Sequence, residues 1–133
     1  MEAVKRAVKK SGEGKTVLIV EDNPEIRRAV VKAFLSDGFT TCAEAADGDE
    51  GIAVAERIKP DVIILDLSMP VMNGLQTAPR LRKLLPRTPI ILFTMYGTAL
   101  LKIQAAQVGV DLVVQKTDPL STLIKKAREL IGD

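Results

Sequence analysis

The chain has 133 residues, of which 47% are hydrophobic and 27% are charged, and these values fit one globular domain with an adequate core. A formal net charge of +2 is too small to indicate nucleic-acid binding by itself. The absence of histidine excludes imidazole metal sites, Ser-His-Asp triads and a phosphohistidine relay within this chain. The single cysteine, Cys42, excludes an internal disulfide, and no apolar run is long enough to span a membrane. We therefore expect a soluble cytoplasmic domain.

Residues 1–15 are a basic segment that precedes the first strand pattern. Apolar residues within it fall at helical spacing, but a helix this short is marginal in water without a surface to pack against. We expect residues 1–15 to form a mobile N-terminal extension and residues 16–133 to form the folded domain.

The first half of the domain predicts three strands that alternate with two helices. The strands are short apolar runs bounded by turn residues, and they cover Thr16–Val20, Phe39–Ala43 and Val62–Asp66. The first helix begins at Asn23-Pro24, which supply an N-cap residue and a proline for the first turn. The second helix begins at Asp47-Gly48, and its apolar residues are spaced on one helical face.

The second half predicts two further strands and three further helices. The strands are expected over Ile90–Thr94 and Leu112–Lys116. A helix between Asn73 and Leu85 contains Pro79, which lacks a backbone donor, so the helix either begins near Pro79 or is kinked there. The remaining helices are expected over Ala99–Val108 and Pro119–Ile131.

Five strands that alternate with five helices, without an internal repeat, predict a single α/β domain with a doubly wound parallel sheet, in a flavodoxin-like arrangement. Because the crossovers between parallel strands are right-handed, the carboxyl ends of the strands share one edge of the sheet. Open α/β folds place their functional sites at this edge.

Polar side chains stand at the carboxyl ends of four of these strands, and the set comprises Glu21, Asp22, Asp66, Thr94 and Lys116. Three clustered carboxylates repel one another unless a cation neutralises them, and a hard, oxygen-seeking ion such as Mg²⁺ suits them. A carboxylate can also attack phosphorus to give an aspartyl phosphate, while a hydroxyl and an ammonium hold the phosphoryl oxygens. The set therefore indicates a divalent metal ion and phosphoryl chemistry.

These residues, in this order, resemble the signature of the response-regulator receiver domains of two-component signalling. The segment that begins at Asp66, Asp-Leu-Ser-Met-Pro-Val-Met-Asn-Gly, matches the family's specific Asp-x-x-Met-Pro-x-Met-(Asp/Asn)-Gly motif. The resemblance covers residues 16–132 and is closest to the single-domain, chemotaxis-regulator-like type.

The resemblance implies a phosphoacceptor and a magnesium site. Asp66 is implied as the residue that accepts the phosphoryl group. Glu21 and Asp22 are implied as magnesium-binding acids, together with Asp66 and the backbone carbonyl of Ser68. Mg²⁺ is therefore the expected cofactor.

The resemblance also implies how the signal enters and leaves. Thr94 and Lys116 are implied as the pair that senses the phosphoryl group, which would come from a separate histidine kinase or phosphotransfer protein. The protein would transfer this group to its own aspartate and hydrolyse it, without turning over external substrates. The output face would comprise Ala99–Val108, Leu112–Gln115 and Pro119–Ile131.

Three positions depart from the usual family pattern. Met95 stands next to the sensing threonine, where a small residue is typical, so access to the phosphoacceptor is predicted to be restricted. Val113 replaces an aromatic residue that swings inward in many members, and Tyr96 is expected to line the rim instead. Thr117 follows the sensing lysine where proline is usual. These changes bear on the switching mechanism and remove no catalytic group.

Several functions stay open at this point. The leading hypothesis is a phosphorylation-dependent switch that acts on a downstream protein partner, without direct contact to nucleic acid or membrane. Leu100, Leu101 and Ile103 give more apolar surface than one buried stripe needs, which suggests a homodimer through the output face. An alternative is an interaction module that phosphorylation does not affect. An aspartyl-phosphate hydrolase is disfavoured because Ser68 stands where such enzymes need a second aspartate.

Overall fold

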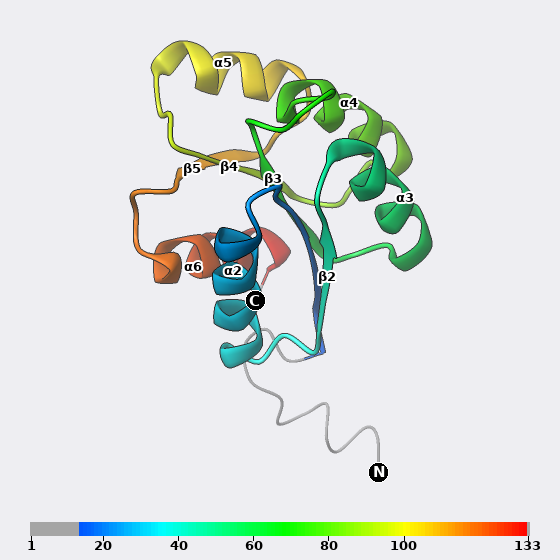
Figure 1. Cartoon of the computed structure of the whole chain (residues 1–133), viewed down its shortest axis with the longest axis vertical. Coiled ribbons are helices and arrows are strands. Elements are labelled where there is room, and N and C mark those ends of the chain that lie inside the picture. The colour runs from blue at the N-terminus through cyan, green and yellow to red at the C-terminus, as the bar shows by residue number, and fades with distance from the viewer. Residues whose placement is uncertain (1–13, 133) are drawn as a thin grey trace.

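A five-stranded parallel sheet forms the centre of the molecule, which a computed structural model describes over residues 14–132 (Figure 1). The strands, in the spatial order β2-β1-β3-β4-β5, are β1 (Thr16–Val20), β2 (Thr41–Ala45), β3 (Val62–Asp66), β4 (Ile90–Thr94) and β5 (Leu112–Gln115). Every neighbouring pair is parallel. The predicted fold class is therefore confirmed. Most of the extension predicted at residues 1–15 lies outside the described residues.

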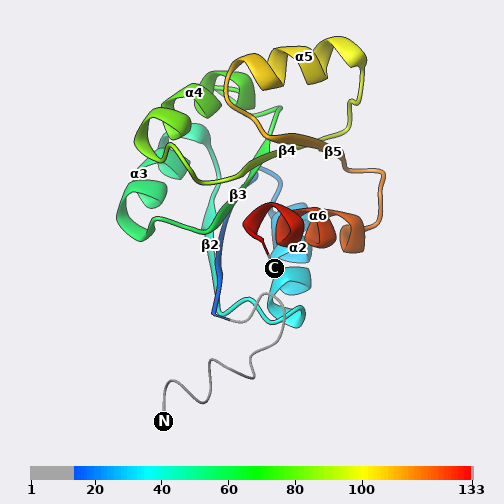
Figure 2. The ribbon, with the colours of Figure 1, turned by 180° about the vertical axis from the view of Figure 1, so that it is seen from behind.

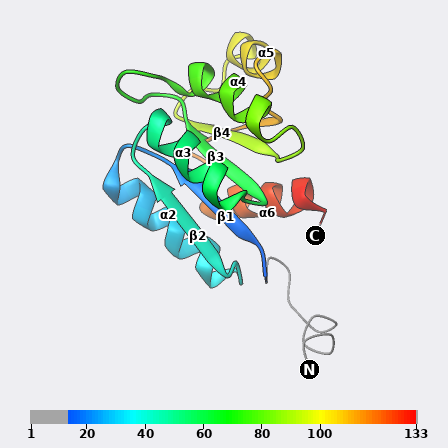
Figure 3. The same cartoon turned by 90° about the vertical axis from the view of Figure 1, so that its right-hand side faces the viewer.

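Helices cover both faces of the sheet (Figures 1 and 2). The helices are α2 (Pro24–Ser36), α3 (Gly48–Ile58), α4 (Gly74–Leu84), α5 (Ala99–Gln107) and α6 (Leu120–Ile131). Helices α2 and α6 lie on one face, and α3, α4 and α5 lie on the other (Figure 3). None of these helices is long and apolar enough to cross a membrane.

The core is divided into two layers by the central strands. Side chains alternate between the faces of a strand, so Val17 and Ile19 of β1 join the layer under α2 and α6. Leu18 and Val20 join the layer under α3, α4 and α5. All four are fully buried, which explains why β1 is an uninterrupted apolar run rather than an alternating one.

The second strand begins two residues later than the predicted Phe39–Ala43, because β2 runs from Thr41 to Ala45. Phe39 belongs instead to the core, where its ring packs edge-on against Phe34 with the centroids 4.8 Å apart. A large aromatic side chain is stabilised more by this burial than by a position on an edge strand.

Helix α4 runs through Pro79 rather than beginning there. Asn73 and Gln76 form a capping box that fixes the helix start at Gly74, five residues before the proline. The first of the two predicted alternatives is therefore wrong. Three further boundaries move by one residue, since α5 ends at Gln107, β5 ends at Gln115 and Pro119 is the N-cap residue of α6.

Arg82 ties together the end of the sheet opposite to the carboxyl ends of the strands. Its guanidinium donates hydrogen bonds to four backbone carbonyls, those of Leu85, Pro86, Thr88 and Gly109. It also pairs with Asp111 at 2.7 Å, and Asp111 accepts the backbone N–H of Ile90. Helix α4, β4 and the turn before β5 are thus held in one register, which fixes the strands that carry the polar residues at the other edge.

Candidate functional site

Three carboxylate side chains meet at the carboxyl edge of the sheet. Glu21 follows β1, and Asp66 ends β3, so two paired strands bring these side chains together. Both residues are buried, with 2% and 3% of their surface exposed, whereas Asp22 is exposed. One carboxylate oxygen from each of the three residues lies within 4.8 Å of the others. The structure thus gathers the three acids that the sequence predicts as metal ligands.

The ammonium group of Lys116 bridges two of these carboxylates. Lys116 Nζ lies 2.7 Å from Glu21 Oε1, and it donates a hydrogen bond of 3.0 Å to Asp66 Oδ1. The lysine side chain is only 11% exposed, and its Nζ also lies 5.8 Å from the centroid of the Phe93 ring. The two buried acids therefore share one buried cation.

The site has the ligands and the charge that a divalent cation requires. Three carboxylates outnumber the one ammonium, and oxygen donors of this kind suit Mg²⁺. Glu21 Oε1 is buried and accepts no hydrogen bond from the described residues, although it is paired with Lys116. A carboxylate has about four lone-pair sites, so Glu21 can pair with Lys116 and still offer an oxygen to a metal ion. The residues present therefore fit the ion that the family implies.

Burial and mutual charge shift the pKa values in the cluster. Burial of Asp66, together with the charge of Glu21 and a hydrogen bond with it, raises the pKa of Asp66 to about 7, although Lys116 opposes this shift. Burial lowers the pKa of Lys116, but its contacts with Glu21 and Asp66 outweigh that effect and hold the pKa above its usual value. The lysine therefore stays charged at neutral pH, and Asp66 takes up a proton at a higher pH than an exposed aspartate does.

Thr94 ends β4 beside Asp66, which pairs with Phe93 across β3 and β4. The threonine is buried, and its Oγ1 accepts the backbone N–H of Tyr96 at 3.2 Å. Its backbone carbonyl accepts the N–H of Lys116 at 2.7 Å. The two residues predicted to sense the phosphoryl group are therefore joined by a hydrogen bond between their backbones.

The loop between β3 and α4 approaches Asp66 closely. The backbone N–H of Ser68 points to Asp66 Oδ1 at 3.3 Å, and the N–H of Gly74 donates to the carbonyl of Leu67 at 2.9 Å. A Cβ atom at Gly74 would lie 2.4 Å from the carbonyl oxygen of Asp66, so only glycine fits. The carbonyl of Ser68 remains a predicted metal ligand.

The same loop contains a strained residue. Val71 has a φ of 68°, a backbone conformation that β-branched residues rarely adopt, and Met72 N–H donates to the carbonyl of Pro70 around it. The valine side chain is 97% exposed, so burial does not compensate for this strain.

The three residues predicted to govern access and switching have different surroundings. Met95 and Tyr96 are exposed, by 57% and 59%, at the start of the loop between β4 and α5. Val113 is partly buried and packs against the core layer under α3, α4 and α5. The control of access by Met95 and the place of Tyr96 in the rim stay predictions.

One residue that contacts the site and one that lies against the loop after β4 were not predicted from the sequence. The guanidinium of Arg27 donates to the backbone carbonyl of Glu21 at 2.7 Å. The amide of Gln115 lies against Gly97 so closely that a Cβ atom there would be 2.5 Å from Gln115 Cδ. Neither had a signal in the sequence, because Arg27 resembles its neighbour Arg28 in type and both contacts are with backbone atoms.

The fold and this arrangement of acids, hydroxyl and lysine define a receiver domain. The chain belongs to the response regulator receiver domain family, whose family model matches residues 17–128. The family predicted from the sequence is therefore confirmed.

Individual relatives agree with this assignment. A putative transcriptional regulator of Pseudomonas aeruginosa is 37% identical over 116 residues, which cover 87% of this chain and 56% of the relative. The chemotaxis protein CheY of Thermotoga maritima is 31% identical over 80% of this chain and 89% of its own length. The structure of chemotaxis protein CheY4 from Vibrio cholerae superposes with a TM-score of 0.82 at 31% identity, covering 87% of this chain and 98% of that one. The chain spans 38% to 56% of the length of several other curated relatives.

The raised pKa of Asp66 predicts how the stability of the metal-free protein depends on pH. A carboxyl group with a raised folded-state pKa contributes stability that is present at low pH and lost as the pH rises through about 7. Asp66→Asn removes this loss. At about pH 8 we expect the variant to exceed the wild type in free energy of unfolding by roughly 2–4 kcal/mol, with little difference near pH 4.

Urea unfolding followed by circular dichroism, with a chelator present, measures this difference. Glu56→Gln is the matched control, because Glu56 is an exposed acid on α3 outside the cluster. An equal stability gain in both variants, or a gain from Asp66→Asn that does not depend on pH, would contradict the role of the buried charge.

Proposed function

We propose that this protein is a phosphorylation-dependent signalling switch that accepts a phosphoryl group on Asp66. Receiver domains of this family interact with kinases and phosphotransfer partners, and the donor here would be a histidine kinase or a phosphotransfer protein. The observation that carries the proposal is the Lys116 ammonium, which lies 3.0 Å from Asp66 Oδ1 in a buried acidic cluster. The cytoplasmic location stays a prediction.

Glu21, Asp22 and Asp66 would hold Mg²⁺, with the Ser68 carbonyl as a further ligand. When bound, the ion would neutralise charge that develops on the phosphoryl oxygens during an in-line transfer. Lys116 supplies a second positive charge from the other side of Asp66, and Thr94 supplies a buried hydroxyl at the end of the next strand.

In the proposed reaction, a carboxylate oxygen of Asp66 attacks the phosphorus of a phosphohistidine on the donor protein. The new oxygen–phosphorus bond forms as the nitrogen–phosphorus bond breaks, and the imidazole of the donor retains the electron pair and takes up a proton. Water later hydrolyses the acyl phosphate and regenerates the carboxylate. The protein modifies only itself and is not a turnover enzyme for external substrates.

The signal would leave through α5, β5 and α6. Thr94 and Lys116 stand at the ends of β4 and β5 and share a backbone hydrogen bond, so a movement of either residue is transmitted to the loop before α5. Leu100 and Ile103 of α5 are 64% and 56% exposed and offer an apolar surface for a partner protein or a second copy.

One observation favours the alternative of a module that does not respond to phosphorylation. Val113 is a small aliphatic residue that packs against the core, so this chain lacks an aromatic side chain there that could change position. In that case Asp66 would still accept a phosphoryl group, and the surface of α5, β5 and α6 would not change.

Phosphorylation is tested with acetyl phosphate, a small acyl-phosphate donor, and intact-protein mass spectrometry. With Mg²⁺ present, we expect the mass to rise by one phosphoryl group, because Asp66 lies between the metal ligands and Lys116. Asp66→Ala and a metal chelator should each abolish the increase.

Asp49→Ala is the matched control, because Asp49 is an exposed aspartate at the start of α3. This variant should be phosphorylated as the wild type is. A wild-type protein that stays unmodified, or an Asp66→Ala variant that is modified equally, would contradict the proposal.

Self-association is predicted when the phosphorylated state is mimicked. With beryllofluoride and Mg²⁺, we expect the mass from sedimentation velocity to rise with protein concentration, because the apolar residues of α5 gain a partner. Ile103→Asp should prevent this rise, since it places a charge in the apolar contact. Leu35→Asp is the control, because Leu35 is 49% exposed in a groove between α2 and β2, and β2 lies at the opposite edge of the sheet from β5. A wild-type mass that does not depend on concentration would sink the homodimer.

A further inference from the structure

We infer that Arg27 is a positioning residue that fixes the acidic loop between β1 and α2 for metal binding, and that Glu44 orients it. The inference rests on the proposed function, because it concerns how the proposed magnesium site is assembled. Among the residues that the structure describes, Arg27 forms no hydrogen bond or ion pair with the three carboxylates of that site, and it acts through the backbone that carries them.

Arg27 joins two elements to the acidic loop. Its Nη1 donates a hydrogen bond of 2.7 Å to the backbone carbonyl of Glu21, and its Nε donates one of 3.1 Å to Glu44 Oε1 on β2. The arginine side chain is 20% exposed. A charged donor at 2.7 Å from a carbonyl makes a stronger hydrogen bond than a neutral donor does.

The backbone of Glu21 is held on both sides. Its N–H donates to the carbonyl of Ala45 at 3.0 Å, and its carbonyl accepts from Arg27. Ala45 and Glu44 are neighbours on β2, so the same short stretch of this strand holds Glu21 directly and through Arg27. Glu44 is 46% exposed, and a pair this exposed contributes orientation rather than much stability.

The remaining bonds of the loop close it around Glu21 and the start of α2. The N–H of Asn23 donates to Glu21 Oε2 at 3.1 Å, and Asn23 Oδ1 caps the helix. The N–H of Arg27 donates to the carbonyl of Asn23, so Arg27 lies one helical turn above the cap. The peptide between Glu21 and Asp22 therefore has few other conformations while Arg27 is bound.

The position of the guanidinium also leaves the ligands free. Because Arg27 bonds a carbonyl of the loop rather than a carboxylate, the oxygens of Glu21 and Asp22 stay available to a cation. A positive charge near a cation site opposes metal binding by simple repulsion. Loss of positioning and loss of repulsion therefore change the affinity for Mg²⁺ in opposite directions, which makes the inference testable.

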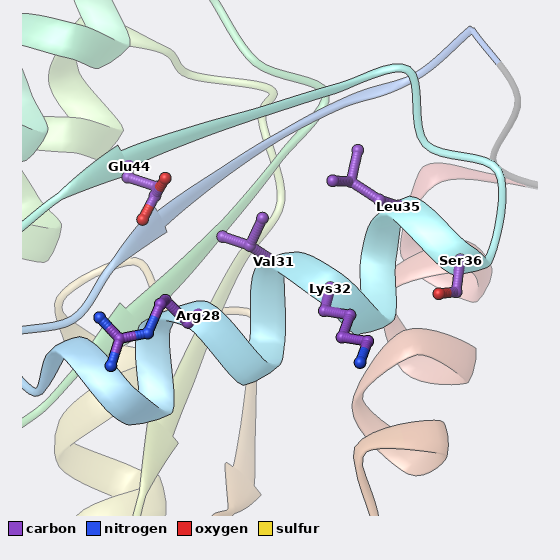
Figure 4. A pocket seen from close by; sticks show the side chains of 6 residues that line it. All are labelled: Arg28, Val31, Lys32, Leu35, Ser36 and Glu44. Atoms are coloured by element: carbon purple, nitrogen blue, oxygen red, sulfur yellow. The ribbon is translucent and has the colours of Figure 1, made fainter.

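The neighbouring residue Arg28 supplies a matched control. Figure 4 shows Arg28 in an open groove between α2 and β2, with Glu44 across from it. Arg28 is exposed and forms no ion pair or hydrogen bond with Glu21 among the residues that the structure describes. Arg28→Met thus removes the same charge from the same helix and leaves the loop bonded.

The experiment is a titration of the full chain with Mg²⁺, followed by amide NMR shifts around Asp22 and Asp66, in a buffer of fixed ionic strength. We expect Arg27→Met to weaken Mg²⁺ binding about tenfold, the effect of losing a residue that orients metal ligands. Arg28→Met should leave the affinity unchanged or slightly raise it. Arg27→Lys and Glu44→Gln should weaken binding by smaller factors, because each leaves only part of the link between β2 and Glu21.

The spectra of the same samples show whether each variant is folded, and Arg27→Lys and Glu44→Gln test the inference if Arg27→Met does not fold. An unchanged or tighter Mg²⁺ affinity in folded variants of Arg27 and Glu44 would overturn the positioning role. A wild-type protein that does not bind Mg²⁺ would instead refute the proposed metal site, which is a separate result.

Discussion

The structure of the site depends on one buried ammonium group placed between two buried carboxylates. Lys116 Nζ lies 2.7 Å from Glu21 Oε1 and 3.0 Å from Asp66 Oδ1, the two acids are nearly inaccessible to water, and the lysine side chain is 11% exposed. Burial of Asp66 and the charge of Glu21 both favour the neutral form of Asp66 and raise its pKa. The lysine offsets part of this cost. The unbalanced negative charge that is left would favour a divalent ion, and under the proposed function Asp66 would then lie beside two cations.

The parallel sheet is what allows residues far apart in sequence to form this cluster. Three neighbouring strands, β1, β3 and β4, place Glu21, Asp66 and Thr94 at one edge, and the turn after β5 adds Lys116. The apolar side chains of these strands fill both core layers. A strand therefore cannot shift by one residue without moving its side chains to the wrong layer. The rigid core therefore carries the ligands, while the loops that bear Asp22 and Ser68 contribute the exposed part of the site.

The sequence predicts the strands and the residues at their ends well, because apolar runs of this length have few alternatives and parallel topology decides where they end. It predicts boundaries less well where packing competes with pattern, as at Phe39, whose ring is buried in the core rather than aligned on β2. It did not show whether the helix begins near Pro79 or continues through it. The capping box that begins at Asn73, six residues earlier, shows that the helix continues through the proline. Contacts between side chains and backbone, such as that of Arg27 with the Glu21 carbonyl, leave no pattern in the sequence at all.

The proposed switch requires that occupation of Asp66 change the surface formed by α5 and β5. A titration with beryllofluoride and Mg²⁺, followed by amide NMR shifts, measures this change, because beryllofluoride mimics an acyl phosphate and needs no donor protein. We expect Mg²⁺-dependent shifts that extend from Asp66 and Thr94 through the loop before α5 to α5 and β5, and that are absent in Asp66→Ala. Shifts confined to the carboxyl edge of the sheet would contradict the switch and favour an interaction module that phosphorylation does not control.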